Sequence, residues 1–133
     1  MALQSTAVFG DDYKEATEAA YCVGVHQSDI EFWKKTDPKS TTDIRDAELK
    51  QFKKQAFVEG AIRRRIIDGA TVSKMKAVGY ADANSCTQQQ ERCTQQWHER
   101  SQQKMDDELN NKMMENCNKL ADPVCERAYK NCD

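Results

Sequence analysis

Six cysteines are the most reactive side chains of this sequence, and two of them stand in a near-repeat. The stretch CTQQQERCTQQWHER (86–100) places Cys86 and Cys93 seven residues apart, each followed by Thr-Gln-Gln. Such cysteines can bind a metal, form a redox pair or belong to two different disulfides. Structural zinc sites and thiol oxidoreductases use short CxxC spacings, and the sequence contains none. The pattern therefore favours disulfides over a metal or redox centre.

The spacing of the cysteines restricts how they can pair. Residues seven apart on one helix are separated by about 10.5 Å of rise, whereas the Cα atoms of a disulfide are rarely more than about 7 Å apart. Cys86 therefore cannot pair with Cys93, and Cys125 cannot pair with Cys132, while their helices are intact. These exclusions reduce the roughly fifteen pairings of six cysteines to about ten.

Two sets of disulfides remain in competition. In the first set, which we favour, Cys117 pairs with Cys125 across a turn at Asp122-Pro123. Its other bonds are Cys22 to Cys86 or Cys93, and Cys132 to whichever of these two is left. The second set consists of Cys86–Cys132, Cys93–Cys125 and Cys22–Cys117. Each bond is expected to add about 2–4 kcal/mol of stability.

Other residues capable of catalysis do not form a recognisable constellation. Only two histidines occur, His26 in an apolar stretch and His98 in a polar one. Asp106, Asp107 and Glu108 are consecutive, so on a helix their side chains diverge by about 100° and do not make an acid–base pair. Phosphate-binding glycine loops, GxSxG and HExxH are absent from the sequence. We expect a non-enzymatic protein without a cofactor or a metal.

Composition indicates one small domain in an oxidising compartment. The chain has 133 residues, of which 38% are hydrophobic and 32% charged, so its core is modest. An even number of cysteines in such a domain predicts a periplasmic or secreted protein whose signal peptide has been removed. No stretch approaches the roughly 18 apolar residues of a membrane span. The net charge of −2 gives no reason to expect nucleic acid as a partner.

Helical periodicity dominates the chain and predicts an all-α fold. A first helix is expected from Asp11 or Asp12 to the residues before Pro38, with residues 1–10 as a flexible N-terminus. The second should begin at Thr42 or Asp43 and end at Asp68-Gly69. Its apolar residues form two stripes: one contains Leu49, Phe52, Ala56 and Ile67, and the other Ile44, Val58 and Ile62. A helix with two stripes is expected between two neighbours, or in a homodimer.

The second half of the chain is more polar. Residues 72–78 predict a short helix closed by Gly79, followed by a long helix from Asp82 or Asn84 to about Leu120. This long helix either wraps around its neighbours or breaks near 101–104. Asp122-Pro123 predicts the start of a last short helix. The expected fold is a disulfide-stapled bundle of about four to five helices, forming a single domain over residues 1–133.

Trp97 stands apart from the other aromatic residues because its neighbours are polar. It either caps the core beside a disulfide, which we favour, or anchors an interface. The candidate interface is the glutamine-rich surface around it, which comprises Trp97, His98, Gln89, Gln96 and Arg100.

The segment YCVGVHQ (21–27) resembles the YC-x-GV-x-Q first helix of small secreted proteobacterial all-helical proteins of unknown function. Gly79, Asp82, Cys86 and Cys93 match a second segment of that group, and the C-terminal CERAYKNC fits as well. The absence of Asn-x-Ser/Thr sites also favours a bacterial source. In its small size and helical, cysteine-containing character the chain also resembles periplasmic immunity proteins, which neutralise cell-wall-degrading toxins. The resemblance implies an inhibitor that binds another protein, such as a secreted toxin or hydrolase.

Two other functions compete with this one. Helical six-cysteine carriers of small ligands have C-x3-C and C-x8-C pairs, whereas this chain has C-x6-C, C-x7-C and C-x6-C. A carrier also needs a large apolar cavity, which 38% hydrophobic content can barely line. An envelope structural or assembly factor would look the same in sequence as an inhibitor.

Overall fold

Four helices make up most of the chain in the computed structural model. The structure describes the backbone of residues 2–103 and 105–133, and it describes their side chains except those of residues 2–10 and 118–122. The helices are α1 (Ala2–Thr36), α2 (Thr41–Arg63), α3 (Gly69–Gln102) and α4 (Asp107–Tyr129). The described part contains no strand, which confirms the all-α prediction. Within that part, no helix has the length and apolar character needed to cross a membrane.

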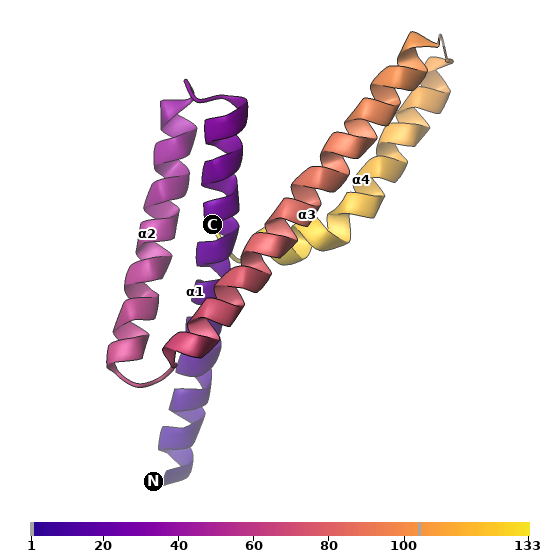
Figure 1. The fold of residues 1–133 in the computed structure, drawn as a ribbon. Helices are drawn as coiled ribbons and strands as arrows, with labels where there is room; N and C mark the ends of the chain where they lie inside the picture. Colours follow the sequence, from indigo (N-terminus) through magenta and orange to yellow (C-terminus); the bar gives the residue numbers. More distant parts are fainter. Residues whose placement is uncertain (1, 104) are drawn as a thin grey trace.

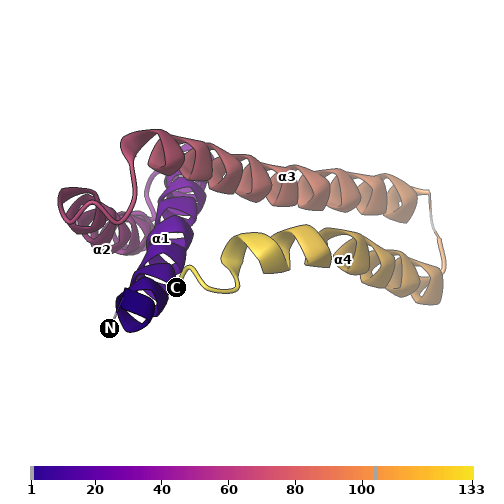
Figure 2. The same ribbon diagram turned by 90° about the horizontal axis from the view of Figure 1, so that it is seen from below.

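The four helices form two antiparallel hairpins joined in the shape of a V (Figure 1). One arm is the α1–α2 hairpin and the other is the α3–α4 hairpin, in which α4 returns toward α1 (Figure 2). The main packing interfaces are α1 with α3, α1 with α2 and α3 with α4. Because α3 crosses α1 near its middle and then leaves it, the two arms diverge toward the end of α1.

Small residues on α1 bring α2 close to it. Ala16 and Ala20 are fully buried and pack in one cluster with Val58, Ala61 and Ile67. α1 ends at Thr36, as the residues before Pro38 predict. It begins at Ala2, however, so the expected start at Asp11 or Asp12 is wrong. The expected flexibility of 1–10 stays a prediction, since Met1 and the side chains of 2–10 lie outside the description.

The end of α2 differs from the prediction. The helix stops at Arg63 rather than at Asp68-Gly69, and Arg65 takes a left-handed conformation with φ of 58°. This early stop turns the chain back, so that Ile67 enters the core at 4% exposure. A continued helix would have pointed Ile67 along the opposite face, with Phe52.

Neither apolar stripe of α2 is buried over its whole length. Val58 and Ala61 face α1, but Ile62 in the stripe of Val58 is 38% exposed. In the other stripe Leu49 is 52% exposed and Phe52 is 70% exposed. The expectation that α2 lies between two neighbours of its own chain is therefore wrong. The reason is that α3 packs along α1, and only its first turns reach the core cluster that contains Val58 and Ala61 of α2. The alternative of a homodimer stays a prediction.

Gly79 marks a helix crossing and not the helix end that was expected. α3 runs without a break through Gly79, and the separate helix at 72–78 is not present. A Cβ atom on Gly79 would collide with the backbone of Tyr21, and one on Gly24 would collide with the backbone of Lys76 and Tyr80. The two glycines thus let α1 and α3 touch backbone to backbone.

The break between α3 and α4 follows one of the two predicted alternatives. α3 ends at Gln102, and Asp106 caps α4 by accepting a hydrogen bond from the Glu108 amide. The expected new helix at Asp122-Pro123 does not form, because α4 continues through Pro123. Disulfides at Cys117 and Cys125 hold α4 on α3 on both sides of this proline.

All six cysteines form disulfides, but neither expected set is present. The bonds are Cys22–Cys132, Cys86–Cys125 and Cys93–Cys117, with Cα–Cα distances of 5.1, 5.2 and 5.5 Å. Because α3 and α4 are antiparallel, a cysteine later in α3 pairs with one earlier in α4. The Cys117–Cys125 bond is impossible, since both residues lie on one helix. The exclusions of Cys86–Cys93 and Cys125–Cys132 are confirmed.

Candidate functional site

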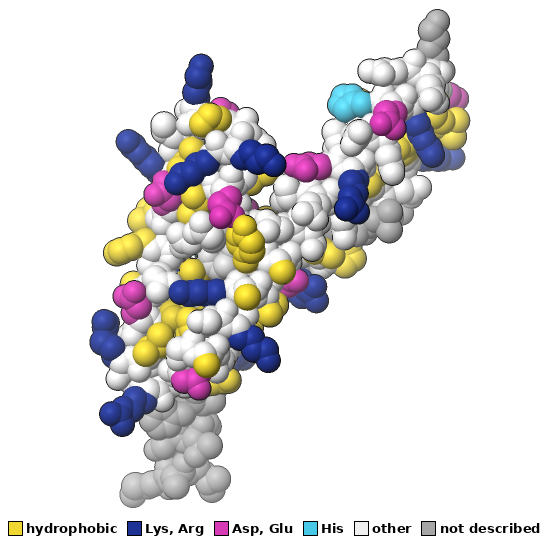
Figure 3. Space-filling model, viewed as in Figure 1, with side chains coloured by type: hydrophobic (Ala, Val, Ile, Leu, Met, Phe, Trp, Pro, Cys, Tyr) yellow, Lys and Arg dark blue, Asp and Glu magenta, His cyan; other side chains and the backbone are white. Residues whose placement is uncertain are grey.

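A cleft of about 860 Å³ opens between the two arms of the V. Figure 3 shows it as the hollow between the α1–α2 arm and the α3–α4 arm. Its walls come from the C-terminal part of α1 and the outer half of α3, and its floor from α4. The lining residues are Asp29, Phe32, Trp33, Cys86, Thr87, Gln90, Glu91, Thr94, Gln95, His98, Glu99, Gln102, Cys125 and Tyr129.

The α1 wall of the cleft is aromatic. Phe32 and Trp33 are half-buried, and their rings meet edge to face with centroids 5.6 Å apart. They follow the buried Ile30 near the end of α1, where α3 has already diverged. One face of the aromatic pair is therefore left without a covering helix.

The α3 wall is a polar helix face. Its residues recur at the spacing of one face of a helix, at positions 87, 90, 91, 94, 95, 98, 99 and 102. All are threonine, glutamine, glutamate or histidine. The disulfide-forming Cys86 and Cys93 hold the adjoining face of α3 against α4, so this polar face is free to point into the cleft.

A hydrogen bond between Tyr129 and Asp29 forms the floor. The Tyr129 hydroxyl donates to Asp29 Oδ1 at 2.8 Å, which joins α4 to α1. Burial raises the pKa of the Asp29 carboxyl, and the bond from Tyr129 only partly opposes this effect. Burial and then the Asp29 carboxylate raise the pKa of Tyr129 above its ordinary range, so the phenol remains a donor.

Polar contacts between the arms fix the opening of the V. Tyr21 of α1 donates to Asp82 Oδ2 of α3 at 2.7 Å. Within the α3–α4 arm, Arg127 Nε lies 3.0 Å from the same oxygen and holds the Asp82 carboxylate in place. Ser28 donates to Asn84 Oδ1 at 2.6 Å, further along the α1–α3 contact. With the glycine crossing beside them, these bonds set the two walls of the cleft at a fixed separation.

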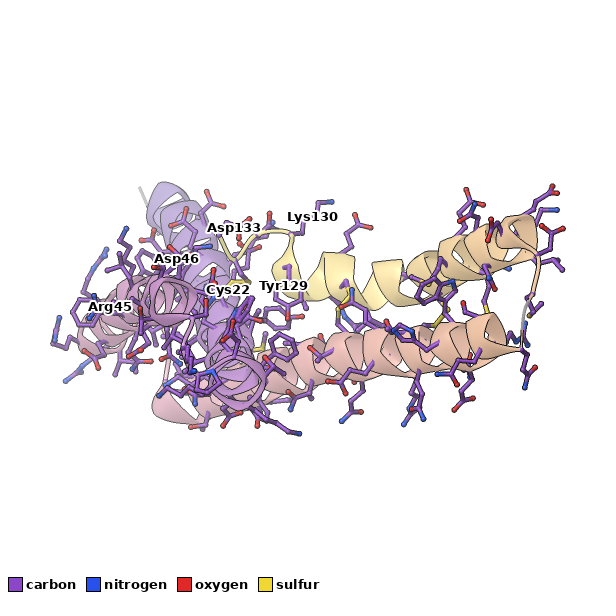
Figure 4. All side chains as sticks on the ribbon, turned by 90° about the horizontal axis from the view of Figure 1, so that it is seen from above. Cys22, Arg45, Asp46, Tyr129, Lys130 and Asp133 are labelled. Carbon is purple, nitrogen blue, oxygen red and sulfur yellow. A yellow bond between two sulfur atoms is a disulfide. The ribbon has the colours of Figure 1, made fainter. Side chains whose placement is uncertain are left out.

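A second hollow of about 510 Å³ lies where α1, α2 and the end of the chain meet. Figure 4 shows Cys22, Asp46 and Asp133 gathered there. Lys50 Nζ lies 3.3 Å from Asp46 Oδ2 and 3.6 Å from Asp133 Oδ1. Charges of both signs line this hollow, so it shows no preference for a cation or an anion.

The five candidate interface residues predicted from the sequence do not lie on one face of α3. His98 lies on the α3 wall of the cleft, while Gln89, Gln96, Trp97 and Arg100 are not among its lining residues. Trp97 is half-buried on the cysteine-bearing side of α3, with its ring centroid 4.8 Å from that of His98. The interface role of these residues stays a prediction.

Sequence reasoning missed the residues that form the cleft on α1 and α4. Phe32 and Trp33 have no sequence feature that sets them apart from the other aromatic residues, and Asp29 and Tyr129 are 100 residues apart. The one available signal was the all-polar helical face at 87–102, which lies beside the cysteine positions.

His26, which lies in an apolar stretch of the sequence, is buried at 2% exposure. Neither ring nitrogen forms a hydrogen bond of good geometry within the described part of the chain, although the Cys132 backbone lies nearby. Burial lowers the pKa of the imidazole below its ordinary value of 6.5, more than the Cys132 backbone raises it. His26 is therefore neutral in the folded protein at neutral pH.

We expect His26 to make the fold less stable in mild acid. Below pH 6.5 the unfolded chain binds a proton at His26 that the folded chain does not. The free energy of unfolding therefore decreases as the pH is lowered below this value. One group contributes at most about 1.4 kcal/mol per pH unit. Urea unfolding of the parent and of His26→Gln at pH 5.0–7.5 would measure how the free energy of unfolding of each protein depends on pH. Asp29 is present in both proteins, so its contribution cancels in the difference between the two pH slopes. Equal pH slopes would contradict the prediction.

Comparisons with known proteins identify no relative: no family model, curated protein or solved structure matches the chain. The three disulfides are consistent with an extracellular or otherwise oxidising environment. The cleft between the arms is thus the feature of this structure on which a functional argument can be built.

Proposed function

We propose that this protein is a non-enzymatic binding module of the periplasm or the cell exterior, which inhibits another protein by holding a segment of it in the cleft. A secreted toxin or hydrolase is the kind of partner that fits such a role. The observation that carries the proposal is the 860 Å³ cleft, with an aromatic wall and a polar wall, between the two arms.

The disulfides within the α3–α4 arm and between that arm and α1 support this proposal. Two disulfides join α3 to α4, and a third joins the end of the chain to α1. A binding surface that is already rigid loses less conformational entropy when a partner docks, so more of the contact energy becomes affinity. A V-shaped scaffold with fixed arms is suited to such preorganised recognition.

The composition of the walls suits a polypeptide segment. Tryptophan and tyrosine are enriched among the residues that dominate binding energy in protein interfaces, and here Trp33 and Tyr129 line the cleft. Glutamine and threonine on α3 can bond the backbone of a bound segment. The α3 wall from 87 to 102 is about 22 Å long, which exceeds the size of most small ligands.

A carrier of small apolar ligands is less well supported. The cleft is as large as ligand pockets of about 300–1,000 Å³. Its α3 wall, however, is polar and mostly exposed, so an apolar ligand would cover groups that need hydrogen bonds. An envelope assembly factor would use the same cleft to hold a protein. A homodimer through Leu49, Phe52 and Ala56 on α2 would leave the cleft open.

The test compares Trp33→Ala with Trp97→Ala. Tagged protein would be used to recover partners from an envelope extract of its own organism, with quantification by mass spectrometry. We expect Trp33→Ala to weaken the binding of a specific partner at least about 30-fold, the effect of a hot-spot residue, because it removes the larger ring of the aromatic wall. Trp97→Ala should retain the partner.

Phe52→Ala serves as a control for nonspecific apolar capture, since Phe52 is the most exposed large apolar side chain described. A partner that is lost with Trp97→Ala and kept with Trp33→Ala would show that binding occurs at the glutamine-rich surface and not in the cleft. Capture that none of the three substitutions changes would contradict the cleft as the binding surface.

A further inference from the structure

We infer that the cleft selects a basic segment, whose lysine or arginine side chains reach between Trp33 and the carboxylates of the opposite wall. This inference rests on the proposed function, because it names the chemistry of the segment that the cleft would hold.

The charge of the lining carries the first step. Three carboxylates line the cleft, Asp29 on α1 and Glu91 and Glu99 on α3, and among the described side chains no lysine or arginine lines it. Over the whole chain 20 basic residues nearly balance 22 acidic ones. The cleft is therefore a local concentration of negative charge, where a cationic segment is attracted and an anionic one is repelled.

The aromatic wall supplies the second step. Trp33 lies on the wall opposite the two glutamates, half-buried and edge to face with Phe32. An indole face attracts a guanidinium or ammonium group, and it does so most strongly where water is partly excluded. A side chain with a long apolar stem and a cationic end can contact the ring and a carboxylate at once.

Asp29 places a third carboxylate at the floor of the cleft, where it can bind a basic side chain. Tyr129 donates to Oδ1 of Asp29, and Oδ2 can accept from a bound cation. Burial disfavours the charged form of this carboxyl group, and neither the bond from Tyr129 nor the charge of Lys50 fully offsets that effect. A basic side chain that reaches the floor would stabilise the charged form further.

The two glutamates set a spacing for the segment. Glu91 and Glu99 are eight residues apart on α3, which corresponds to about 12 Å along the helix. The same distance separates residues i and i+8 of a bound helix, or about i and i+4 of an extended strand. Two basic residues at either spacing would match both carboxylates.

Other segment types fit less well. A purely apolar helix would cover the threonine, glutamine and glutamate side chains of α3 and leave their polar groups without partners. An acidic segment would add like charges beside the three carboxylates. The basic segment alone satisfies both the aromatic and the acidic wall.

The experiment uses a random twelve-residue phage-displayed peptide library, selected on the intact oxidised protein and counter-selected on Trp33→Ala. We expect the recovered peptides to be enriched in lysine and arginine. Synthetic peptides would then be titrated by tryptophan fluorescence in a Trp97→Phe background, which leaves Trp33 as the single tryptophan of this two-tryptophan chain.

Two further substitutions test the charges directly. The double variant Glu91→Gln/Glu99→Gln should weaken a selected peptide about 10-fold, and so should replacement of its basic residues by glutamine. Glu59→Gln/Glu115→Gln removes the same charge from exposed sites on α2 and α4 and should leave the affinity unchanged. An equal loss with this control would contradict the inference.

The outcomes separate the inference from the proposed function. The preference for a basic segment would be contradicted if the recovered peptides need Trp33 but lack basic residues, or if they bind Glu91→Gln/Glu99→Gln as tightly as the parent. The cleft would remain a binding site in either case. Recovery of no peptide that depends on Trp33 would overturn both.

Discussion

Gly79→Ala is expected to lower the free energy of unfolding by about 3 kcal/mol, near the upper range for overpacking a tightly packed core. A Cβ at this position meets the backbone carbonyl of Tyr21, which cannot rotate away as a side chain would. The collision must be relieved by separating α1 from α3 at their crossing. For a chain of this size the midpoint of thermal unfolding should fall by about 10 °C. Thermal and urea unfolding would measure the effect.

Gly60→Ala is the matched control for this substitution. Gly60 also lies inside a helix, but a Cβ there meets nothing within 4 Å. Alanine has the higher helix propensity, so this variant should gain up to about 1 kcal/mol. A Gly79→Ala protein as stable as the parent would show that the two helices do not touch at this point.

Loss of the Cys22–Cys132 bond should cost more than loss of either other disulfide. In the chain-entropy model the cost grows with the loop that the bond closes. This bond spans 110 residues, whereas Cys93–Cys117 spans 24. We expect losses of up to about 4.8 kcal/mol for Cys22→Ser/Cys132→Ser and up to about 3.5 kcal/mol for Cys93→Ser/Cys117→Ser, because the two disulfides that remain shorten the loop that each bond closes. Urea unfolding of the oxidised variants would measure both values.

The same pair of variants also tests the connectivity. Non-reducing peptide mapping of the parent should recover Cys22 with Cys132 and Cys93 with Cys117. Any other pairing would contradict the fold, because α4 could then not lie antiparallel on α3 in the observed register. A larger loss for the shorter loop would contradict the chain-entropy explanation.

Features decided by local chemistry could be predicted from the sequence. The all-α class follows from composition and periodicity, the end of α1 from Pro38, and the two excluded disulfides from helix rise. Gly79 was misread because a glycine that ends a helix and one that lets two helices touch look alike in sequence. Pro123 was misread for a similar reason, since two disulfides to α3 hold α4 continuous around it.

Features decided by tertiary geometry could not be predicted. The correct disulfides require knowing that α3 and α4 are antiparallel and where α1 meets the chain end. The cleft depends on the angle at which α3 leaves α1, and no local pattern encodes that angle. Asp29 and Tyr129 meet across 100 residues only after both arms are in place. The polar face at 87–102 was visible in the sequence, but the aromatic wall facing it was not.

The Cys22–Cys132 bond has a consequence for survival among proteases. It encloses all three connections between helices, at 37–40, 64–68 and 103–106. A protease that cuts any one of them therefore leaves a single covalent molecule, whose pieces stay tied beside their former neighbours. Exposed loops are the usual sites of nicking. A chain cut once at a connection between helices therefore stays one molecule, and the cleavage does not release a fragment.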